Sequence, residues 1–201
     1  MAIDSDTVPH HLYTEELRLA LDTAVRGGGG DAHRVVPAVR SVLADFVRRH
    51  AGQVPNEFAD APQDRYARRL MHRSDELGYA VIAMTWSAGQ RTPIHDHCGM
   101  WCVEGVWQGC IEVVQYECLE RQDEFCRFEP RGCMQACAGS AGSLIPPHEY
   151  HTIANAQDDG AAITVHVYAD HMTTCNIFEP ASNVAEKGEW YRRLPRQLHL
   201  D

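Results

Sequence analysis

From Gly78 onward the chain is a succession of short, β-rich segments separated by Gly, Pro, Asn and Asp. The clearest of these segments are GYAVIAMTW, MWCVEGVWQGCIEVVQYEC, GSLIPP, HTIAN and AAITVHVYA. Many short strands between turn-forming residues are typical of a β-sandwich or a β-barrel. The sequence therefore predicts a mainly β fold, with a barrel over residues 76–180.

The first third of the chain has helical patterns instead. TEELRLALDTAV, which starts at Thr14, places apolar residues at helical spacing and runs into four glycines, which end a helix. AHRVVPAVRSVLADFVRRHAG repeats the pattern, and Pro37 is expected in its first turn. APQDRYARRLMHRS, residues 61–74, predicts a third helix.

These patterns predict one domain over residues 1–201. Residues 1–75 are expected to form a helical cap, and residues 76–180 the β-barrel with the functional site. Residues 181–201 are polar, and we expect them to form a C-terminal extension that covers a sheet edge.

Composition excludes several classes of protein. The net charge of −10 argues against a nucleic-acid partner, which would require a basic face. No apolar run approaches the length of a membrane span, and the N-terminus lacks the features of a secretory signal, so we expect a cytoplasmic protein with no membrane contact. The eight cysteines form no CxxC pair, and we expect most of them to be reduced, small core residues. The oligomeric state stays open.

Two histidines, His95 and His97, stand two residues apart in GQRTPIHDHCGMWCVEGVWQG. Residues i and i+2 of a strand point to the same face, so the two imidazoles should project together. A pair of surface histidines near a turn is the simpler alternative. A second segment, SAGSLIPPHEYHTIAN, adds His151, with His148 as a rival to it.

Together the two segments resemble the two motifs of the cupin superfamily, a double-stranded β-helix (jelly-roll) barrel. The residues in register with these motifs are Gly89, His95, His97, Gly109, Pro146, His151 and Asn155. Ser140 and His148 stand where the second motif has glycines, and Cys102 stands where the first has a metal-binding glutamate. Three neutral imidazoles suit Fe(II), although Zn, Cu or Ni would also accept them. Without the glutamate we expect no protein anion at the metal, which would favour an anionic ligand such as a thiolate.

The segment TVHVYA places Thr164, His166 and Tyr168 on one face of a strand. With these residues added, the region from about Tyr66 to Phe178 resembles the cysteine dioxygenase family of thiol dioxygenases. The resemblance implies Fe(II) on three histidines, a Ser-His-Tyr type triad with Thr in place of Ser, and an arginine that binds the substrate carboxylate.

The resemblance assigns a role to each matching position. The metal ligands correspond to His95, His97 and His151, the triad to Thr164, His166 and Tyr168, and the substrate contacts to Tyr66, Arg68 and Cys175. Cys102 and Tyr168 hold the places of a Cys-Tyr thioether known in the family; the alternative is that Cys102 is a small buried residue. The implied reaction joins both atoms of O2 to the sulfur of a thiol and yields a sulfinic acid.

Alternatives remain for the substrate and for the class of function. Arg68 favours L-cysteine over 3-mercaptopropionate, while Arg69 or His148 could serve the second carboxylate of mercaptosuccinate. A non-catalytic cupin that binds a metal or ligand as a sensor or scaffold is the alternative outside enzymes. A buried Thr-His-Tyr chain argues against that alternative, because such a network is costly unless it is used or fully paired.

Overall fold

The structure, a computed structural model, describes residues 10–181 and 190–201. Two helices come first, α1 (His10–Gly28) and α2 (Ala32–Arg49), and a short 3-10 helix, η1 (Asn56–Phe58), follows them. The strands are β1 (Ala67–Ser74), β2 (Tyr79–Trp86), β3 (Ile94–His95), β4 (Cys102–Gln108), β5 (Cys110–Gln122), β6 (Phe125–Cys137), β7 (Ala141–Leu144), β8 (His151–Asn155), β9 (Ala162–Ala169), β10 (Thr174–Pro180) and β11 (Trp190–Gln197). Residues 1–9 of the predicted cap and 182–189 of the predicted C-terminal extension lie outside the described residues.

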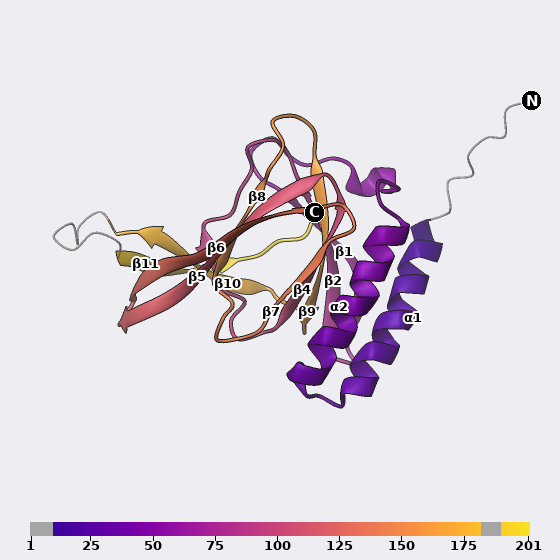
Figure 1. Cartoon of the computed structure of the whole chain (residues 1–201), viewed down its shortest axis with the longest axis horizontal. Helices are drawn as coiled ribbons and strands as arrows, with labels where there is room; N and C mark the ends of the chain where they lie inside the picture. Colours follow the sequence, from indigo (N-terminus) through magenta and orange to yellow (C-terminus); the bar gives the residue numbers. More distant parts are fainter. Residues whose placement is uncertain (1–9, 182–189) are drawn as a thin grey trace, which may run out of the picture.

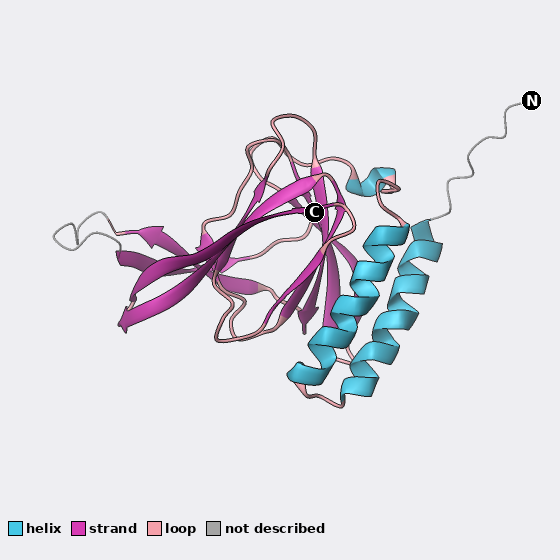
Figure 2. Cartoon of the chain, in the orientation of Figure 1, coloured by secondary structure: helices cyan, strands magenta, loops and turns pink. Residues whose placement is uncertain are grey.

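The strands form two antiparallel sheets, and both helices lie against one of them (Figures 1 and 2). One sheet has the order β1-β2-β9-β4-β7, and the other closes in the order β10-β11-β6-β5-β8-β3. Strand β11 pairs with both β10 and β6, so residues 190–197 of the predicted extension belong to the second sheet. The predicted mainly β architecture with N-terminal helices is confirmed.

Strands β2 and β9 are apolar almost throughout because both of their faces are covered. Val81 and Ala83 of β2 join a core cluster with the helices, whereas Ile82 and Met84 join the cluster inside the barrel. On β9 the residues that pack against the helices are Ile163, Val165 and Val167. Because side chains alternate along a strand, the polar residues between and after them lie on the inner face; these are Thr164, His166 and Tyr168. The helix-covered face thereby orients the polar residues toward the site.

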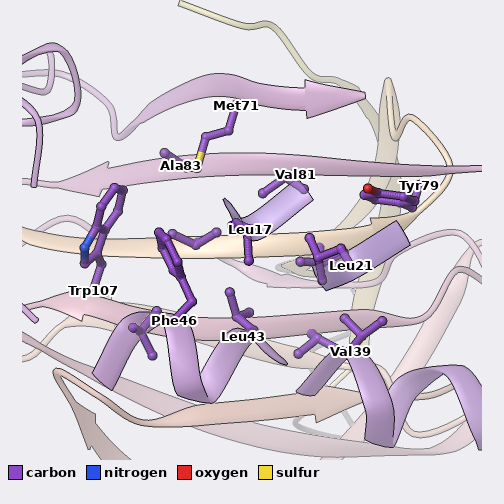
Figure 3. Packing of buried hydrophobic residues seen from close by; sticks show 14 of the residues in the cluster. Leu17, Leu21, Val39, Leu43, Phe46, Met71, Tyr79, Val81, Ala83 and Trp107 are labelled. Atoms are coloured by element: carbon purple, nitrogen blue, oxygen red, sulfur yellow. The ribbon is translucent and has the colours of Figure 1, made fainter. Parts of the chain in front are cut away.

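Helix α2 packs closely on β4, and Gly105 makes that approach feasible. A Cβ at Gly105 would lie 2.9 Å from Cγ of Leu43, closer than non-bonded carbon atoms tolerate. Phe46 stacks obliquely on Trp107 at 5.3 Å between ring centroids, and the Trp107 indole N–H donates to the carbonyl of His50 at 2.9 Å. Figure 3 shows Leu43 and Phe46 of α2 directed at the sheet that contains β4.

Leu43→Ala is expected to destabilise the protein by about 2–5 kcal/mol, because Leu43 is fully buried and the cavity cannot collapse fully. Urea denaturation would measure the change in the free energy of unfolding. Leu19→Ala on α1 is the control, since Leu19 is 54% exposed and its loss should cost less than about 0.5 kcal/mol. Equal costs for the two variants would contradict the close packing of α2 on β4.

Two details of the predicted helices are wrong. Residues 67–74 form strand β1 rather than a third helix, and β1 pairs with β2 along its length. Pro37 lies in the second turn of α2, not the first, because the helix starts at Ala32, where Asp31 caps it by accepting from the backbone N–H of His33.

Most cysteines are free thiols, as predicted, but they are not all core residues. Cys110 and Cys137 form a disulfide between β5 and β6, and Cys98 and Cys133 are exposed. Among the described residues, neither long helix has the length and apolar character that crossing a membrane would require.

Candidate metal centre

Three imidazoles meet where β3 and β8 pair. His95 ends β3 and His151 begins β8, and the two are directly opposite in the register of these strands. His97 follows two residues after the end of β3, so it projects from a loop rather than from a strand. The ring centroids are 4.2 Å apart for His95 and His151, 5.0 Å for His97 and His151, and 5.5 Å for His95 and His97. One donor nitrogen of each ring lies within 4.8 Å of the others.

Backbone carbonyls orient two of the rings. Nδ1 of His151 lies 2.8 Å from the carbonyl oxygen of Glu149, and Nδ1 of His95 lies 3.2 Å from that of Pro93. A carbonyl oxygen only accepts, so each Nδ1 carries the hydrogen and each Nε2 keeps a free lone pair. The backbone of His97 is held in turn by the Glu149 carboxylate, which accepts from its N–H at 2.9 Å.

The electrostatic setting keeps these rings neutral. Burial lowers the pKa of His97 and of His151 well below the ordinary histidine value, and the neighbouring imidazoles lower both further. Burial also lowers the pKa of His95. Metals bind only unprotonated imidazole, so the donor set fits a metal ion. Within the described part of the chain, Nε2 of His151 is buried without a hydrogen-bond partner, as expected for an atom reserved for a metal.

Asp96, between the first two histidines, points the opposite way and anchors the loop. Its carboxylate accepts hydrogen bonds from the backbone N–H of Cys98 and from the backbone N–H and the side-chain amide of Asn176 on β10. The alternation predicted for His-Asp-His therefore serves two purposes, because the histidines face the pocket while Asp96 ties their loop to the barrel.

The polar face of β9 forms a hydrogen-bonded chain. Oγ1 of Thr164 lies 2.8 Å from Nε2 of His166, whose Nδ1 lies 3.3 Å from the hydroxyl of Tyr168. The Trp86 indole N–H donates to the Thr164 oxygen at 2.9 Å. Burial, followed by the positive charge of Arg68, lowers the pKa of His166 to about 3, so this ring is neutral.

Cys102 lies directly opposite Tyr168 in the pairing of β4 with β9. Both side chains are buried, and Sγ of Cys102 also lies 4.0 Å from Nδ1 of His166. Burial raises the pKa of the thiol and of the phenol well above their ordinary values. Both groups are therefore protonated near neutral pH.

A pocket opens onto the three histidines, and the predicted substrate residues line it. Arg68 is 5% exposed and reaches the pocket from β1, not from a helix. Tyr66 stacks on Trp86 at 4.3 Å between ring centroids, and Cys175 of β10 is buried in the wall. The apolar part of the lining also includes Met84, Pro93, Ile153, Met172, Ile177 and Leu198.

Sequence reasoning missed Arg196 and offered Arg69 or His148 as the second cationic residue of the pocket. Arg196 of β11 lines the pocket, opposite Cys175 in the strand pairing. Arg69 instead donates to the carbonyl of Asp60 and to the hydroxyl of Thr85, and His148 is exposed. Neither Arg69 nor His148 is part of the pocket lining, so the second cation of the pocket comes from the C-terminal strand.

Sequence reasoning also missed Glu104, a buried carboxyl group beside one of the three histidines. Glu104 lies two residues after Cys102 on β4, so the alternation of the strand puts both on the inner face. Its Oε1 lies 3.4 Å from Nε2 of His151. Burial raises the pKa of this carboxyl to about 7. The two-residue alternation of a strand, applied to Cys102 in the segment CVEGV, predicts that Glu104 faces the same side.

The last residues of the chain hold the backbone at Arg68. The Asp201 carboxylate accepts from the N–H of Arg68 at 2.9 Å, and the N–H of Asp201 donates to the Arg68 carbonyl at 2.8 Å. The Arg68 guanidinium donates to the carbonyl of His199 at 3.5 Å. A hydrogen bond from Arg65 lowers the pKa of Asp201 to about 2.

Asp201→Asn is expected to destabilise the protein at pH 7 and to have a smaller effect in acid. A carboxyl whose folded pKa is depressed stabilises the fold above its unfolded value near 3.8, and that contribution is lost as the pH falls toward about 2. Urea denaturation of parent and variant at pH 7 and pH 3 would measure the difference. The exposed Asp75, replaced by Asn, is the control. A cost that grows in acid would refute this assignment.

Sequence comparison places these residues in a known family. Residues 36–181 match the profile of the family described as cysteine dioxygenase type I. The chain is 22% identical over 150 residues to cysteine dioxygenase type 1 of Danio rerio, covering 72% of this chain and 74% of that protein. It is 23% identical over 124 residues to the Rattus norvegicus protein of that name, covering 61% and 60% of the two chains.

Among solved structures, the chain is similar to a conserved protein with a double-stranded β-helix domain from Klebsiella pneumoniae. The identity is 17% and the TM-score 0.41, over 57% of this chain and 84% of that one. The family match, together with the two sheets and N-terminal helices described above, confirms the predicted cupin fold class. The chain belongs to the cysteine dioxygenase type I family.

Proposed function

We propose that the protein is a non-heme iron thiol dioxygenase that converts L-cysteine to cysteine sulfinic acid. Membership of the family supports an oxygenase-type enzyme that uses O2 and a small molecule. The observation that carries the proposal is one pocket that holds three neutral imidazoles and a buried guanidinium, that of Arg68.

His95, His97 and His151 are the proposed metal ligands. Three neutral nitrogen donors leave coordination positions free, which is the arrangement of non-heme iron oxygenases. An Fe(II) ion at this site would supply the binding of the thiolate and the activation of O2. The protein residues around it orient the substrate and exclude side reactions.

Arg68 is the proposed partner of the substrate carboxylate. A guanidinium presents two parallel N–H groups that match a carboxylate, and burial strengthens the contact because the local dielectric is low. Tyr66 and Cys175 form the wall beside Arg68, and we assign them to substrate contact. A thiol held by its carboxylate at Arg68 directs its sulfur toward the histidines.

Tyr168 is the proposed proton donor of the pocket. In the direction we propose, Trp86 donates to Thr164, the Thr164 hydroxyl donates to Nε2 of His166, and Nδ1–H of His166 donates to the Tyr168 oxygen. The Tyr168 proton then remains available to the bound substrate or O2. Thr164 and His166 act through Tyr168, by fixing its orientation.

A thioether between Cys102 and Tyr168 is part of the proposal. The two residues are cross-strand neighbours on the inner face, at the spacing that brings side chains into contact. Bond formation would remove one hydrogen from the thiol and one from the ring, and O2 accepts the two electrons and two protons. Mass spectrometry of the chain after reduction of the Cys110–Cys137 disulfide would show the loss of 2 Da expected for the two hydrogens, because a thioether survives reduction.

A thiol with two carboxylates is the second candidate, and Arg196 favours it. Mercaptosuccinate could place one carboxylate at Arg68 and the other at Arg196, because both guanidinium side chains line the pocket. 3-Mercaptopropionate has a single carboxylate, so it would use only one of these two guanidinium groups.

The test is O2 uptake by the Fe(II)-loaded protein with L-cysteine, 3-mercaptopropionate and mercaptosuccinate in parallel. Uptake with cysteine, stoichiometric with sulfinate, would support the proposal. Uptake with mercaptosuccinate alone would move the assignment to the dicarboxylate thiol. No uptake with any of the three would refute thiol dioxygenation and favour a cupin that binds a metal as a sensor or scaffold.

A further inference from the structure

The structure contains a second cavity, of about 430 Å³, that the proposed reaction does not use. It lies between strands β4 and β7 of the first sheet and the hairpin formed by β5 and β6. Within the described chain, it shares no lining residue with the pocket at the three histidines. A concave space of this size is typical of sites that hold a small organic molecule.

The walls of this cavity are aliphatic. Val113 of β5 is paired with Met134 of β6 on one side, and Val106 of β4 and Leu144 of β7 line the other. Met134 is 52% exposed although it lines the cavity, so its apolar surface is left uncovered. Among the described residues, no aromatic ring contributes to the lining, which favours an aliphatic chain over a flat ring that would stack.

The space at Gly142 of β7 is empty. Gly142 is paired in register with Glu104, which groups with Cys102 and His166 on the inner face of the sheet, so a side chain at position 142 would point inward. A Cβ at Gly142 would meet no non-neighbouring atom of the described residues within 4 Å. Since packed protein interiors contain few voids, this unfilled position is space that a ligand can take.

A positive charge stands at the exposed end of the cavity. Arg40 of α2 belongs to the lining and is exposed, and in the described part of the chain no ion pair joins it to a carboxylate. Ser140 and Ser143 add hydroxyl groups that can donate to an anion. The other charged residue type of the lining, Glu104, is buried at the inner end. The cavity therefore combines an aliphatic interior with a rim suited to one anionic group.

We propose that this cavity binds a small monocarboxylate with an unbranched aliphatic chain, the carboxylate at Arg40 and the chain along Val106, Val113 and Leu144. One guanidinium matches one carboxylate through two parallel N–H groups. The net charge of −10 disfavours a ligand that carries several negative charges. This site is independent of the proposed thiol reaction, so its test requires no enzyme activity.

Isothermal titration calorimetry of the full chain with hexanoate and octanoate tests the proposal. Each buried methylene should tighten binding about fourfold, so octanoate should bind roughly 10- to 15-fold more tightly than hexanoate. Gly142→Leu fills the cavity and is expected to weaken octanoate binding more than about tenfold, since it displaces at least two methylenes.

Gly132→Leu is the matched control for Gly142→Leu. Gly132 of β6 is also exposed and also has open space at its Cβ, but it lies outside the cavity lining. Neither glycine has a positive φ, so leucine fits the backbone at both positions. The control should bind octanoate as the parent does. Parent-like binding in Gly142→Leu would overturn the proposal.

Arg40→Met tests the charge, because it keeps an aliphatic stem and removes the guanidinium. It should weaken octanoate binding about 3- to 10-fold and leave the binding of 1-octanol unchanged. Equal affinity of parent and Arg40→Met for octanoate would refute the carboxylate contact. Absence of binding by the parent would refute the site, and a loss in Arg68→Ala with parent-like binding in Arg40→Met would place the ligand in the histidine pocket instead.

Discussion

His151→Ala is expected to abolish stoichiometric iron binding. The ring is one of the three proposed imidazole ligands, its Nε2 is buried, and the carbonyl of Glu149 fixes its orientation. An alanine leaves a buried gap that no neighbouring histidine fills, because His95 and His97 are held by their own strand and loop. Anaerobic loading with Fe(II), removal of unbound metal and a colorimetric iron assay would measure the remaining stoichiometry.

His148→Ala is the matched control for this measurement. It removes the same side chain three residues earlier, and His148 is exposed rather than part of the pocket. The control should retain one iron per chain. Stoichiometric iron in His151→Ala, together with its loss in His148→Ala, would reverse the assignment of the third ligand. A thermal unfolding profile close to the parent's would exclude global unfolding as the cause.

The core of the site could be predicted because it depends on local alternation and short spacings. Residues i and i+2 share a face of a strand, which places Thr164, His166 and Tyr168 together once the helix-facing residues of β9 are apolar. The meeting of His95 with His151 depends on strand pairing, which no single segment encodes. That meeting was predicted only from the resemblance to the family motifs.

The sequence misled where tertiary pairing overrides local preference. The charged and apolar residues of 61–74 have helical spacing, yet β1 forms because residues 67–74 pair with β2 at the edge of a sheet. Arg68 reaches the pocket from that strand. Arg196 was missed for a related reason, since β11 is polar and only its pairing with β10 brings it to the pocket.

Glu104 shows a different limit. The sequence shows that Glu104 lies two residues after Cys102 and therefore shares a strand face with it. The cupin motif has its glutamate at the position of Cys102, so the comparison with that motif did not identify Glu104. The contact with His151 becomes apparent only when β4 and β8 are both in place around the barrel interior.

Arg68→Ala is expected to raise the KM for L-cysteine by roughly 30- to 1000-fold. The loss of a desolvated charged contact costs on the order of 2–4 kcal/mol, and each 1.4 kcal/mol is a factor of ten. Arg68 is buried in the pocket wall, so water cannot replace the guanidinium efficiently. Steady-state O2 uptake at varied cysteine concentration would measure the change.

Two controls isolate the carboxylate contact from general damage to the pocket. Arg69→Ala removes the neighbouring guanidinium, which bonds to Asp60 and Thr85 outside the pocket, and should leave the KM near the parent value. Cysteamine, a thiol without a carboxylate, should lose far less than cysteine when Arg68 is replaced. An unchanged KM for cysteine in Arg68→Ala would eliminate Arg68 as the carboxylate partner. Equal losses for both thiols would instead show that Arg68 supports the pocket without contacting the carboxylate, and Arg196 would become the candidate.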